Sequence, residues 1–396
     1  MSSFLQEKID IAAHNAEVAR VWNAYNSGKP YRVPLMIIGS ITNYFLNPEL
    51  NTNGWTFKDF FENPDVQIRA QLEYQKWQRF NILCDREMGV PNDGWQISVD
   101  FQNCYDASWF GCPIKYIPGQ VPDTEDILKT DKMRLYDMPE CIDYDNGLIG
   151  RAIEFFDYMH DQAKDMEFEG RAVISPDRIL GEGTDGPLDL AYKLRGADNV
   201  LMDMMTDEKY YHDLMGYITD NLINRMKKLR QLRSSKLSDN ESEEYGKGPF
   251  FFADDAVALI SNEHYQEFVY PYHKRIVDEF SDNLSLSLHM CGDATRHFKF
   301  IKDSLGVTAF DTGFPVDHGW LREQLGPDIT IQGGPTVMTI KYGNPKEIEC
   351  EVKKVCQSGV MKGGKFIMIA ANNLAPCTPV ENVKALYEST KVYGNY

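Results

Sequence analysis

A histidine and a cysteine stand two residues apart in the segment LHMCGD, residues 288–293, at the end of an apolar run. If that run is a β-strand, His289 and Cys291 point to the same face, because side chains alternate along a strand. An imidazole nitrogen and a thiolate sulfur are ligands that zinc prefers. The pattern predicts a zinc site, and its alternative is a core histidine beside an unreactive buried cysteine. A further ligand must come from elsewhere, and Cys377, just after the last apolar run, is the cysteine candidate.

Carboxylates follow several other apolar runs in the same manner. A charged group that is buried without a partner is costly, so these side chains need a metal, a substrate or a paired neighbour. We expect Asp85 and Asp255 to be catalytic, either by orienting the substrate or by moving a proton. The alternative is that an arginine holds each of them, and the arginines considered are Arg86, Arg178 and Arg296. Substrate-binding roles are predicted for Glu182, Asp254, Asp311 and Gly333.

Eight short apolar runs that end in polar or glycine-rich residues recur along the chain. They occupy residues 33–40, 80–89, 170–178, 248–255, 284–293, 307–315, 329–335 and 365–373. Such continuous runs are typical of parallel strands that are covered on both faces, and helical patterns separate them. We therefore predict an α/β fold, a (β/α)8 TIM barrel, in which catalytic residues lie where the strands end.

The same pattern predicts a single domain over residues 1–396, with a helical extension at the N-terminus and a long insertion after the second strand. Residues 90–169 are too many for one crossover helix, and they carry Trp95 and Trp109 among several turn signals. Long loops at the mouth of a barrel commonly form lids. We expect this segment to cover the barrel mouth.

The composition excludes some partners. A formal net charge of −18 disfavours a nucleic acid, because phosphate binding needs clustered cations. No stretch approaches the roughly 20 apolar residues that cross a bilayer, and the start of the chain does not resemble a signal peptide. We expect a cytoplasmic protein with reduced cysteines and no membrane partner.

Four stretches, in this order, resemble the uroporphyrinogen decarboxylase superfamily from about residue 30 to the C-terminus. They are GPLDLAYKLRGADNVLMDMMTD (186–207), DDAVALISNEHYQEFVYPYHKRI (254–276), LHMCGD (288–293) and NNLAPCTPVENVKALYE (372–388). The resemblance implies a (β/α)8 barrel with its site in the C-terminal mouth, and it places Asp85 where that family keeps a key aspartate. The decarboxylases carry an arginine-rich segment after the first strand, whereas this chain reads IIGSITNYF there. That departure argues against porphyrin decarboxylation.

The H-x-C-G stretch resembles the corrinoid-dependent methyltransferase branch of the superfamily. This resemblance implies zinc held by His289, Cys291 and a later cysteine. The later position falls at Asn372 here, so either Cys377 reaches back or a carboxylate such as Asp255 or Glu182 takes the place.

The activity that this branch implies is methyl transfer between a small methyl donor, with a methyl ether preferred, and a corrinoid. The chain lacks a D-x-H-x-x-G segment for cobalamin, so the corrinoid must be bound to a separate carrier protein. A decarboxylase of a small or tetrapyrrole carboxylate and a non-catalytic binding barrel remain the alternatives, and a homodimer is left open.

Overall fold

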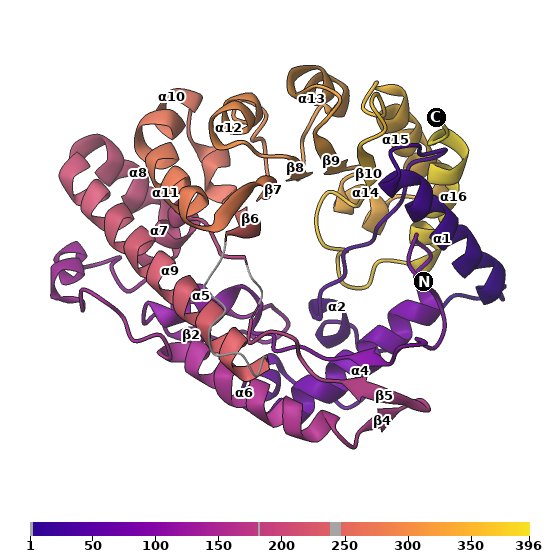
Figure 1. Ribbon diagram of the computed structural model, residues 1–396, viewed down its shortest axis with the longest axis horizontal. Coiled ribbons are helices and arrows are strands. Elements are labelled where there is room, and N and C mark those ends of the chain that lie inside the picture. Colours follow the sequence, from indigo (N-terminus) through magenta and orange to yellow (C-terminus); the bar gives the residue numbers. More distant parts are fainter. Residues whose placement is uncertain (1–2, 181–182, 238–246) are drawn as a thin grey trace.

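The computed structural model describes residues 3–180, 183–237 and 247–396. The second half of the chain is built on five parallel strands with helices between them (Figure 1). In the order β10-β9-β8-β7-β6 across the sheet, they are β6 (Gly248–Ala253), β7 (Ser281–Met290), β8 (Ala309–Thr312), β9 (Thr330–Gly333) and β10 (Phe366–Met368). The predicted α/β class with a parallel sheet is confirmed.

Alternate residues of these strands are buried beneath the connecting helices. The register aligns one residue of each strand in a single transverse row: Phe252, Leu288, Phe310, Ile331 and Phe366. Each of these five side chains is fully buried. Burial of one such side chain is worth about 1.5–3 kcal/mol relative to its exposure, so this row fixes which face of the sheet packs against the helices.

The connecting helices begin at signals in the sequence. A capping box formed by Asn344 and Glu347, with a proline at the first position, starts α15 (Pro345–Gln357). The side chain of Asp317 caps α13 (His318–Leu325). The other helical segments of this half are η3 (Asp255–Leu259), α10 (Asn262–His264), η4 (Tyr265–Val269), α11 (Tyr270–Phe280), α12 (Phe298–Leu305), α14 (Val337–Tyr342) and α16 (Val380–Tyr393).

Single parallel bridges add a segment at each edge of the sheet. Leu35 pairs with Met368 of β10, and Asp185 pairs with Ala253 of β6. The backbone nitrogen of Asp85 donates to the Leu35 carbonyl at 2.8 Å. In space, the first predicted strand therefore lies beside β10, the eighth, and the second lies beside the first. A barrel topology requires this order.

The prediction of a third barrel strand at residues 170–178 is wrong. In this segment β5 (Arg171–Ile174) pairs with β1 (Trp95–Gln96) and β4 (Glu167–Phe168), in a sheet separate from β6–β10. Only Val173 of β5 is buried, so the strand lacks the apolar surface for a position covered on both faces. Among the described residues, the ladder of five strands is accordingly not closed into a hydrogen-bonded ring of eight.

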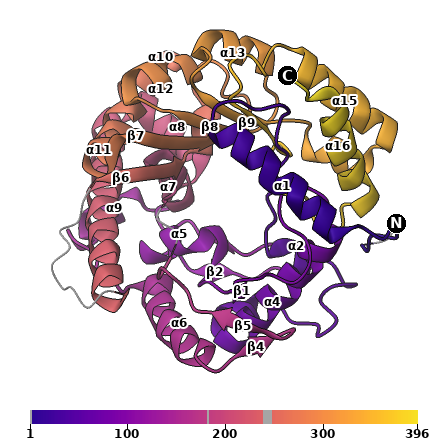
Figure 2. The same cartoon turned by 45° about the vertical axis from the view of Figure 1, so that its right-hand side comes forward.

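The segment from α4 (Pro64–Asn81) to α6 (Gly147–Ala163) lies on the opposite side of the molecule from the sheet (Figures 1 and 2). The predicted N-terminal helix is α1 (Ile11–Asn26), and the other helices outside residues 90–169 are α2 (Thr42–Phe45), α3 (Phe57–Glu62), α4 (Pro64–Asn81), α7 (Pro187–Arg195), α8 (Ala197–Thr206) and α9 (Glu208–Leu237). Residues 90–169 also contain η1 (Gln102–Cys104), α5 (Tyr105–Trp109), β2 (Ile114–Lys115), β3 (Asp123–Thr124), η2 (Lys132–Asp137) and α6 (Gly147–Ala163). No helix among the described residues is both long and apolar enough to span a membrane.

Candidate functional site

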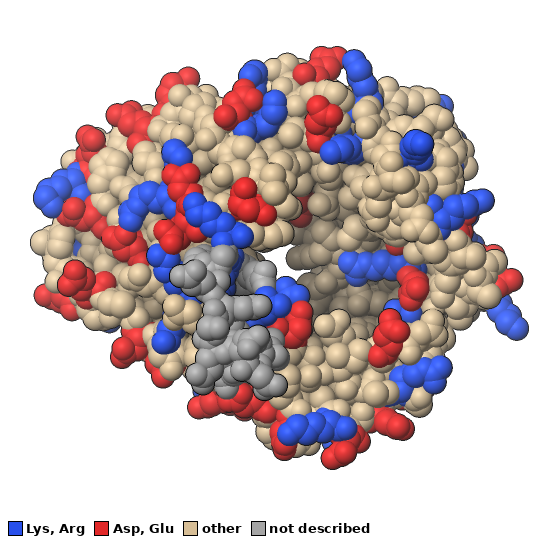
Figure 3. All heavy atoms as spheres, viewed as in Figure 1, with Lys and Arg blue, Asp and Glu red and all other residues tan. Residues whose placement is uncertain are grey.

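A central cavity of about 820 Å³ lies in front of the carboxyl ends of β6, β7 and β8. Figure 3 shows the molecule hollowed at its centre. The sheet contributes Asp255, His289 and Asp311 to the cavity wall, and Tyr105 of α5 contributes to it from residues 90–169. A concave space of this size with several titratable groups has the features of a ligand site.

Asp255, His289 and Cys291 form a group that could hold a metal ion, because one donor atom from each lies within 4.8 Å of the other two. His289 and Cys291 come from the end of β7, and the His289 Nε2 atom lies 2.9 Å from the Cys291 sulfur. Asp255 begins η3 directly after β6. Its Oδ1 atom accepts the backbone N–H of Cys291 at 2.6 Å and lies 3.7 Å from His289 Nε2.

Two further side chains orient these groups. His289 Nδ1 lies 2.9 Å from Asp311 Oδ2, on the neighbouring strand β8. The Asn372 side-chain amide donates to the Cys291 sulfur at 2.9 Å. Although burial opposes the positive charge, the contacts with Asp311 and Cys291 raise the pKa of His289 to about 11. Burial raises the pKa of the Cys291 thiol, while the contact with His289 lowers it.

The donor set fits zinc. It offers one imidazole nitrogen, one sulfur and one carboxylate oxygen, which are the three kinds of ligand that zinc takes in proteins. The remaining ring nitrogen of His289 lies 2.9 Å from a carboxylate, as is usual for a metal-binding histidine. Both features favour the metal-site prediction over a core histidine.

Asp311→Asn should weaken zinc binding without unfolding the protein. The carboxylate lies 2.9 Å from His289 Nδ1, and the loss of such an outer contact typically costs about 10- to 100-fold in metal affinity. Competition with a chromogenic chelator would measure the change. Unchanged zinc affinity would show that the contact between Asp311 and His289 does not affect metal binding.

Cys377 is not part of this group. Its exposed side chain contacts the Leu46 carbonyl, at 3.4 Å from sulfur to oxygen. The structure therefore does not bring the predicted cysteine ligand to His289 and Cys291, and the carboxylate that lies beside them is Asp255, one of the two considered. Glu182, the other, lies outside the described residues.

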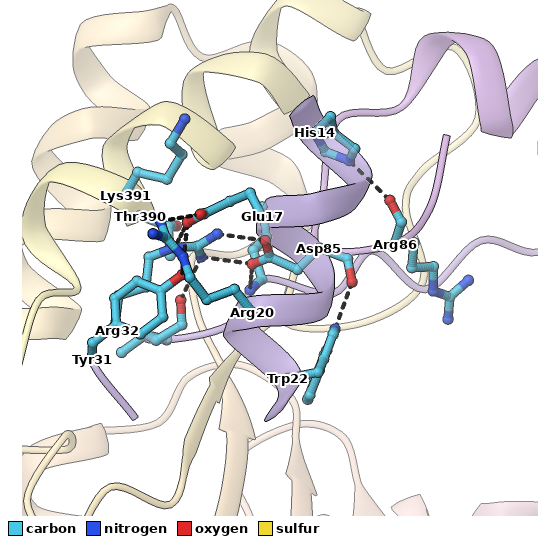
Figure 4. Close-up of polar contacts among 12 residues, drawn as sticks. His14, Glu17, Arg20, Trp22, Tyr31, Arg32, Asp85, Arg86, Thr390 and Lys391 are labelled. Atoms are coloured by element: carbon cyan, nitrogen blue, oxygen red, sulfur yellow. Dashed lines mark hydrogen bonds and ion pairs between the residues drawn. The ribbon is translucent and has the colours of Figure 1, made fainter. Parts of the chain in front are cut away.

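Asp85 faces an arginine rather than the cavity (Figure 4). Both of its carboxylate oxygens accept hydrogen bonds from Arg32, at 2.8 and 2.6 Å, and one also accepts the backbone N–H of Leu35 at 2.7 Å. The Asp85 and Arg32 side chains are almost completely buried. This geometry favours the alternative of a structural ion pair, although the arginine is none of the three that were considered.

Asp254 cannot contact a substrate, because its side chain is fully buried. The carboxylate accepts the backbone N–H groups of Leu188 and Asp189 at the start of α7, at 3.1 and 3.2 Å, and lies 2.8 Å from His273 Nε2. Burial raises the pKa of Asp254 well above its ordinary value. The predicted substrate-binding role at Asp254 is therefore replaced by a structural one.

Gly333 is likewise placed for packing. A Cβ atom added there would lie 2.3 Å from His318 Nε2 and 2.6 Å from Thr312 Oγ1. The absence of a side chain at Gly333 leaves room for His318 of α13. Because Gly333 is buried, we assign it no ligand-binding role.

Sequence reasoning missed Asp189. Its two carboxylate oxygens accept the backbone N–H groups of Asp255 and Ala256, at 2.9 and 2.8 Å, so it fixes the turn that presents Asp255. Burial and the neighbouring carboxylates of Asp254 and Asp255 raise the pKa of Asp189. Its position in the first turn after Gly186 and a proline is a helix-start signal, which does not reveal this contact with a distant loop.

Comparison with known proteins finds a matching family model and several similar proteins. Residues 243–393 match the family model described as uroporphyrinogen decarboxylase (URO-D). A methylcobamide:CoM methyltransferase of Methanosarcina mazei is 24% identical over 303 residues, which are 75% of this chain and 79% of the relative. A methylated-thiol–coenzyme M methyltransferase of the same organism is 28% identical over 209 residues, 52% of this chain and about half (51%) of the relative. A uroporphyrinogen decarboxylase of Prochlorococcus marinus is 26% identical over 147 residues, 36% of this chain and 40% of the relative.

Among solved structures, a methyltransferase from Methanosarcina mazei superposes with a TM-score of 0.61 and 14% identity, and the match covers 95% of this chain and 98% of the other. At this identity the likeness shows a shared fold. It extends over nearly the whole chain, including the residues outside the match to the family model.

Proposed function

Because the chain belongs to the uroporphyrinogen decarboxylase superfamily, we propose that it is a zinc-dependent methyltransferase that moves a methyl group between a small methyl donor and a corrinoid carrier protein. The observation that carries the proposal is the group of Asp255, His289 and Cys291 at the wall of the central cavity. Methyltransferases among the relatives favour methyl transfer over decarboxylation, and so does the described part of the cavity wall, in which Arg178 is the one arginine.

His289, Cys291 and Asp255 would hold the metal, and Asp311 and Asn372 would orient two of these ligands. Zinc in this position supplies a Lewis acid, which stabilises negative charge on a leaving oxygen or keeps a thiol in its thiolate form. Asp189 holds the turn of Asp255 in place through two backbone hydrogen bonds. The chain's own contribution is thus a fixed set of donors at the edge of a cavity that can hold a small molecule.

A methyl ether is the donor that we favour. Its reaction breaks the bond between the methyl carbon and oxygen and forms a bond to the cobalt of a reduced corrinoid, and the leaving oxygen keeps the electron pair and takes up a proton. A thiol is the second candidate substrate, because two relatives are named as methyltransferases of coenzyme M. The corrinoid partner is proposed from the same names and from the resemblance of the H-x-C-G stretch.

For the architecture, we propose one domain in which the five-stranded sheet, the bridged segments at its edges and residues 90–169 together enclose the site as a modified (β/α)8 barrel. Support comes from the parallel bridges of Leu35 and Asp185 and from Tyr105, which lines the cavity from residues 90–169. Residues 90–169 would cover the site.

The test is incubation of the zinc-loaded protein with cob(I)alamin, or with a reduced corrinoid carrier, and a panel of methyl ethers, methylamines and methyl thioethers. The visible spectrum should show methylcobalamin with at least one donor, and the signal should be lost in His289→Ala. If no donor gives methylcobalamin while carbon dioxide is released from a carboxylate substrate, the decarboxylase alternative holds.

A further inference from the structure

The side chains that point to the centre of the molecule form two transverse rows on the sheet. The register of β6 to β9 aligns Ala253, His289, Asp311 and Gln332, which we call the metal row. Two residues earlier on each strand the same register aligns Phe251, Ser287, Ala309 and Thr330, which we call the lower row. The lower row therefore lies directly beneath the level of His289, about 7 Å along the strands.

Three of the four residues in the lower row are small, and all four are at least partly exposed. The interior of a (β/α)8 barrel is ordinarily filled by layers of bulky branched side chains. Here three of the four positions are Ser287, Ala309 and Thr330, all partly exposed, and the ring of Phe251 is 42% exposed. The row on the opposite face of the same strands, which includes Leu288 and Phe310, is fully buried. The inner face of the sheet is thus open to solvent while the outer face is packed.

The central cavity extends down to this row. Its wall includes Phe251, Ser285 and Ser287 as well as His289 at the metal row. Figure 3 shows an opening at the centre of the molecule. One continuous space therefore joins His289 and Asp255 to Phe251 and Ser287 of the lower row.

We propose that the space in front of the lower row is the compartment that holds the small substrate, and that it takes an uncharged molecule of about the size of one aromatic ring. This inference rests on the proposed function. The hydroxyl groups of Ser285 and Ser287 offer neutral hydrogen bonds, and the exposed ring of Phe251 offers a flat apolar surface. A substrate lying there places one end beneath His289.

The charges around the cavity disfavour an anion. Outside the proposed metal ligands, the carboxylates of Asp185 and Asp311 line it. Of the cationic side chains in the wall, Lys193 lies 3.5 Å from Asp123, and Arg178 lies 2.9 Å from Asp177, so each already has an acidic partner. Like-charge contacts in such a space are costly, which leaves an uncharged molecule as the best fit.

Accessibility of the compartment is tested without any enzyme assay. In Ser287→Cys, peptide mapping after treatment with iodoacetamide would compare the introduced thiol with two native thiols of α15, the exposed Cys350 and the buried Cys356. We expect the introduced thiol to react within about tenfold of the rate of Cys350, because thiol reactivity follows exposure. A rate as low as that of Cys356 would mean that the lower row is packed, and would overturn the proposal whether or not the protein transfers methyl groups.

Occupancy by substrate is tested by filling the compartment. Ser287→Phe should lower the rate of methylcobalamin formation at least about 10-fold, because a displaced substrate loses its reactive geometry, while zinc content and melting temperature stay unchanged. Ser287→Ala is the matched control, which removes one hydroxyl without adding volume and should therefore lower the rate less than Ser287→Phe does. A normal rate in Ser287→Phe would overturn the proposal, as would a large fall in its melting temperature, because that fall indicates a packed interior.

The charge preference is tested with methoxybenzene and para-methoxybenzoate, which differ by one carboxylate. We expect kcat/KM for the anion to be at least about 10-fold lower, since repulsion in the cavity opposes its entry. Equal or higher kcat/KM for the anion would reject the uncharged class. If neither compound reacts and no other donor does, the proposed function fails, and the labelling of Ser287→Cys still decides whether the compartment exists.

Discussion

His289→Ala and Cys291→Ala are each expected to lose nearly all bound zinc and nearly all methyl transfer. Each variant removes one of the three protein donors that lie within 4.8 Å of one another. Because outer contacts alone typically change metal affinity about 10- to 100-fold, the loss of a direct ligand should cost at least about 100-fold. Metal analysis after gel filtration and chelator competition would measure the loss, and thermal melting would show that the variants remain folded.

Cys377→Ala is the matched control for that experiment. It also replaces a cysteine near the carboxyl ends of the strands, but this sulfur contacts only the Leu46 carbonyl among the contacts described for it. Zinc content should be unchanged in Cys377→Ala and reduced in Asp255→Ala. Full zinc retention in both His289→Ala and Cys291→Ala would return the pair to a core histidine beside an unreactive cysteine, and zinc loss in Cys377→Ala would show that this cysteine moves to the site when metal binds.

Asp85→Asn should lower the free energy of unfolding by about 3–5 kcal/mol, the usual cost of removing one partner from a buried ion pair. The Arg32 side chain is 3% exposed and has its charge opposed by Asp85 at 2.6 Å. Asparagine keeps the shape but leaves Arg32 only the 3.4 Å contact with Glu17 as a counter-charge, and its amide N–H groups would face other donors. Urea unfolding followed by circular dichroism would measure the change.

An exposed aspartate–arginine pair provides the control for Asp85→Asn. Asp177 also contacts its arginine partner, Arg178, through two hydrogen bonds of 2.9 Å, but both side chains are more than 40% exposed. Asp177→Asn should therefore cost less than about 1 kcal/mol. The folded fraction of Asp85→Asn should react at the normal rate. Normal stability combined with a rate about 100-fold lower would instead make Asp85 a catalytic residue.

The sequence by itself determined the features that depend on local periodicity. Residues two apart on a strand share a face, so the pattern LHMCGD was sufficient to place His289 and Cys291 together, and the structure brings their donor atoms to 2.9 Å. Continuous apolar runs likewise predicted the five parallel strands from β6 to β10. The β5 segment was misassigned because its run of apolar residues is short, and only Val173 is buried.

Tertiary structure alone decided which distant residues meet. The partner of Asp85 is Arg32, 53 positions away, and the third member of the metal group is Asp255, 36 positions before Cys291. The sequence predicts neither contact. Periodicity determines the face on which a side chain lies, but it does not determine which residue of another strand or loop lies next to it. Those neighbours are set by the register of adjacent strands and by the starts of η3 and α7, which Asp189 and Asp254 hold. The accessible lower row has the same origin, since small side chains on three adjacent strands leave an open space only when the register aligns them.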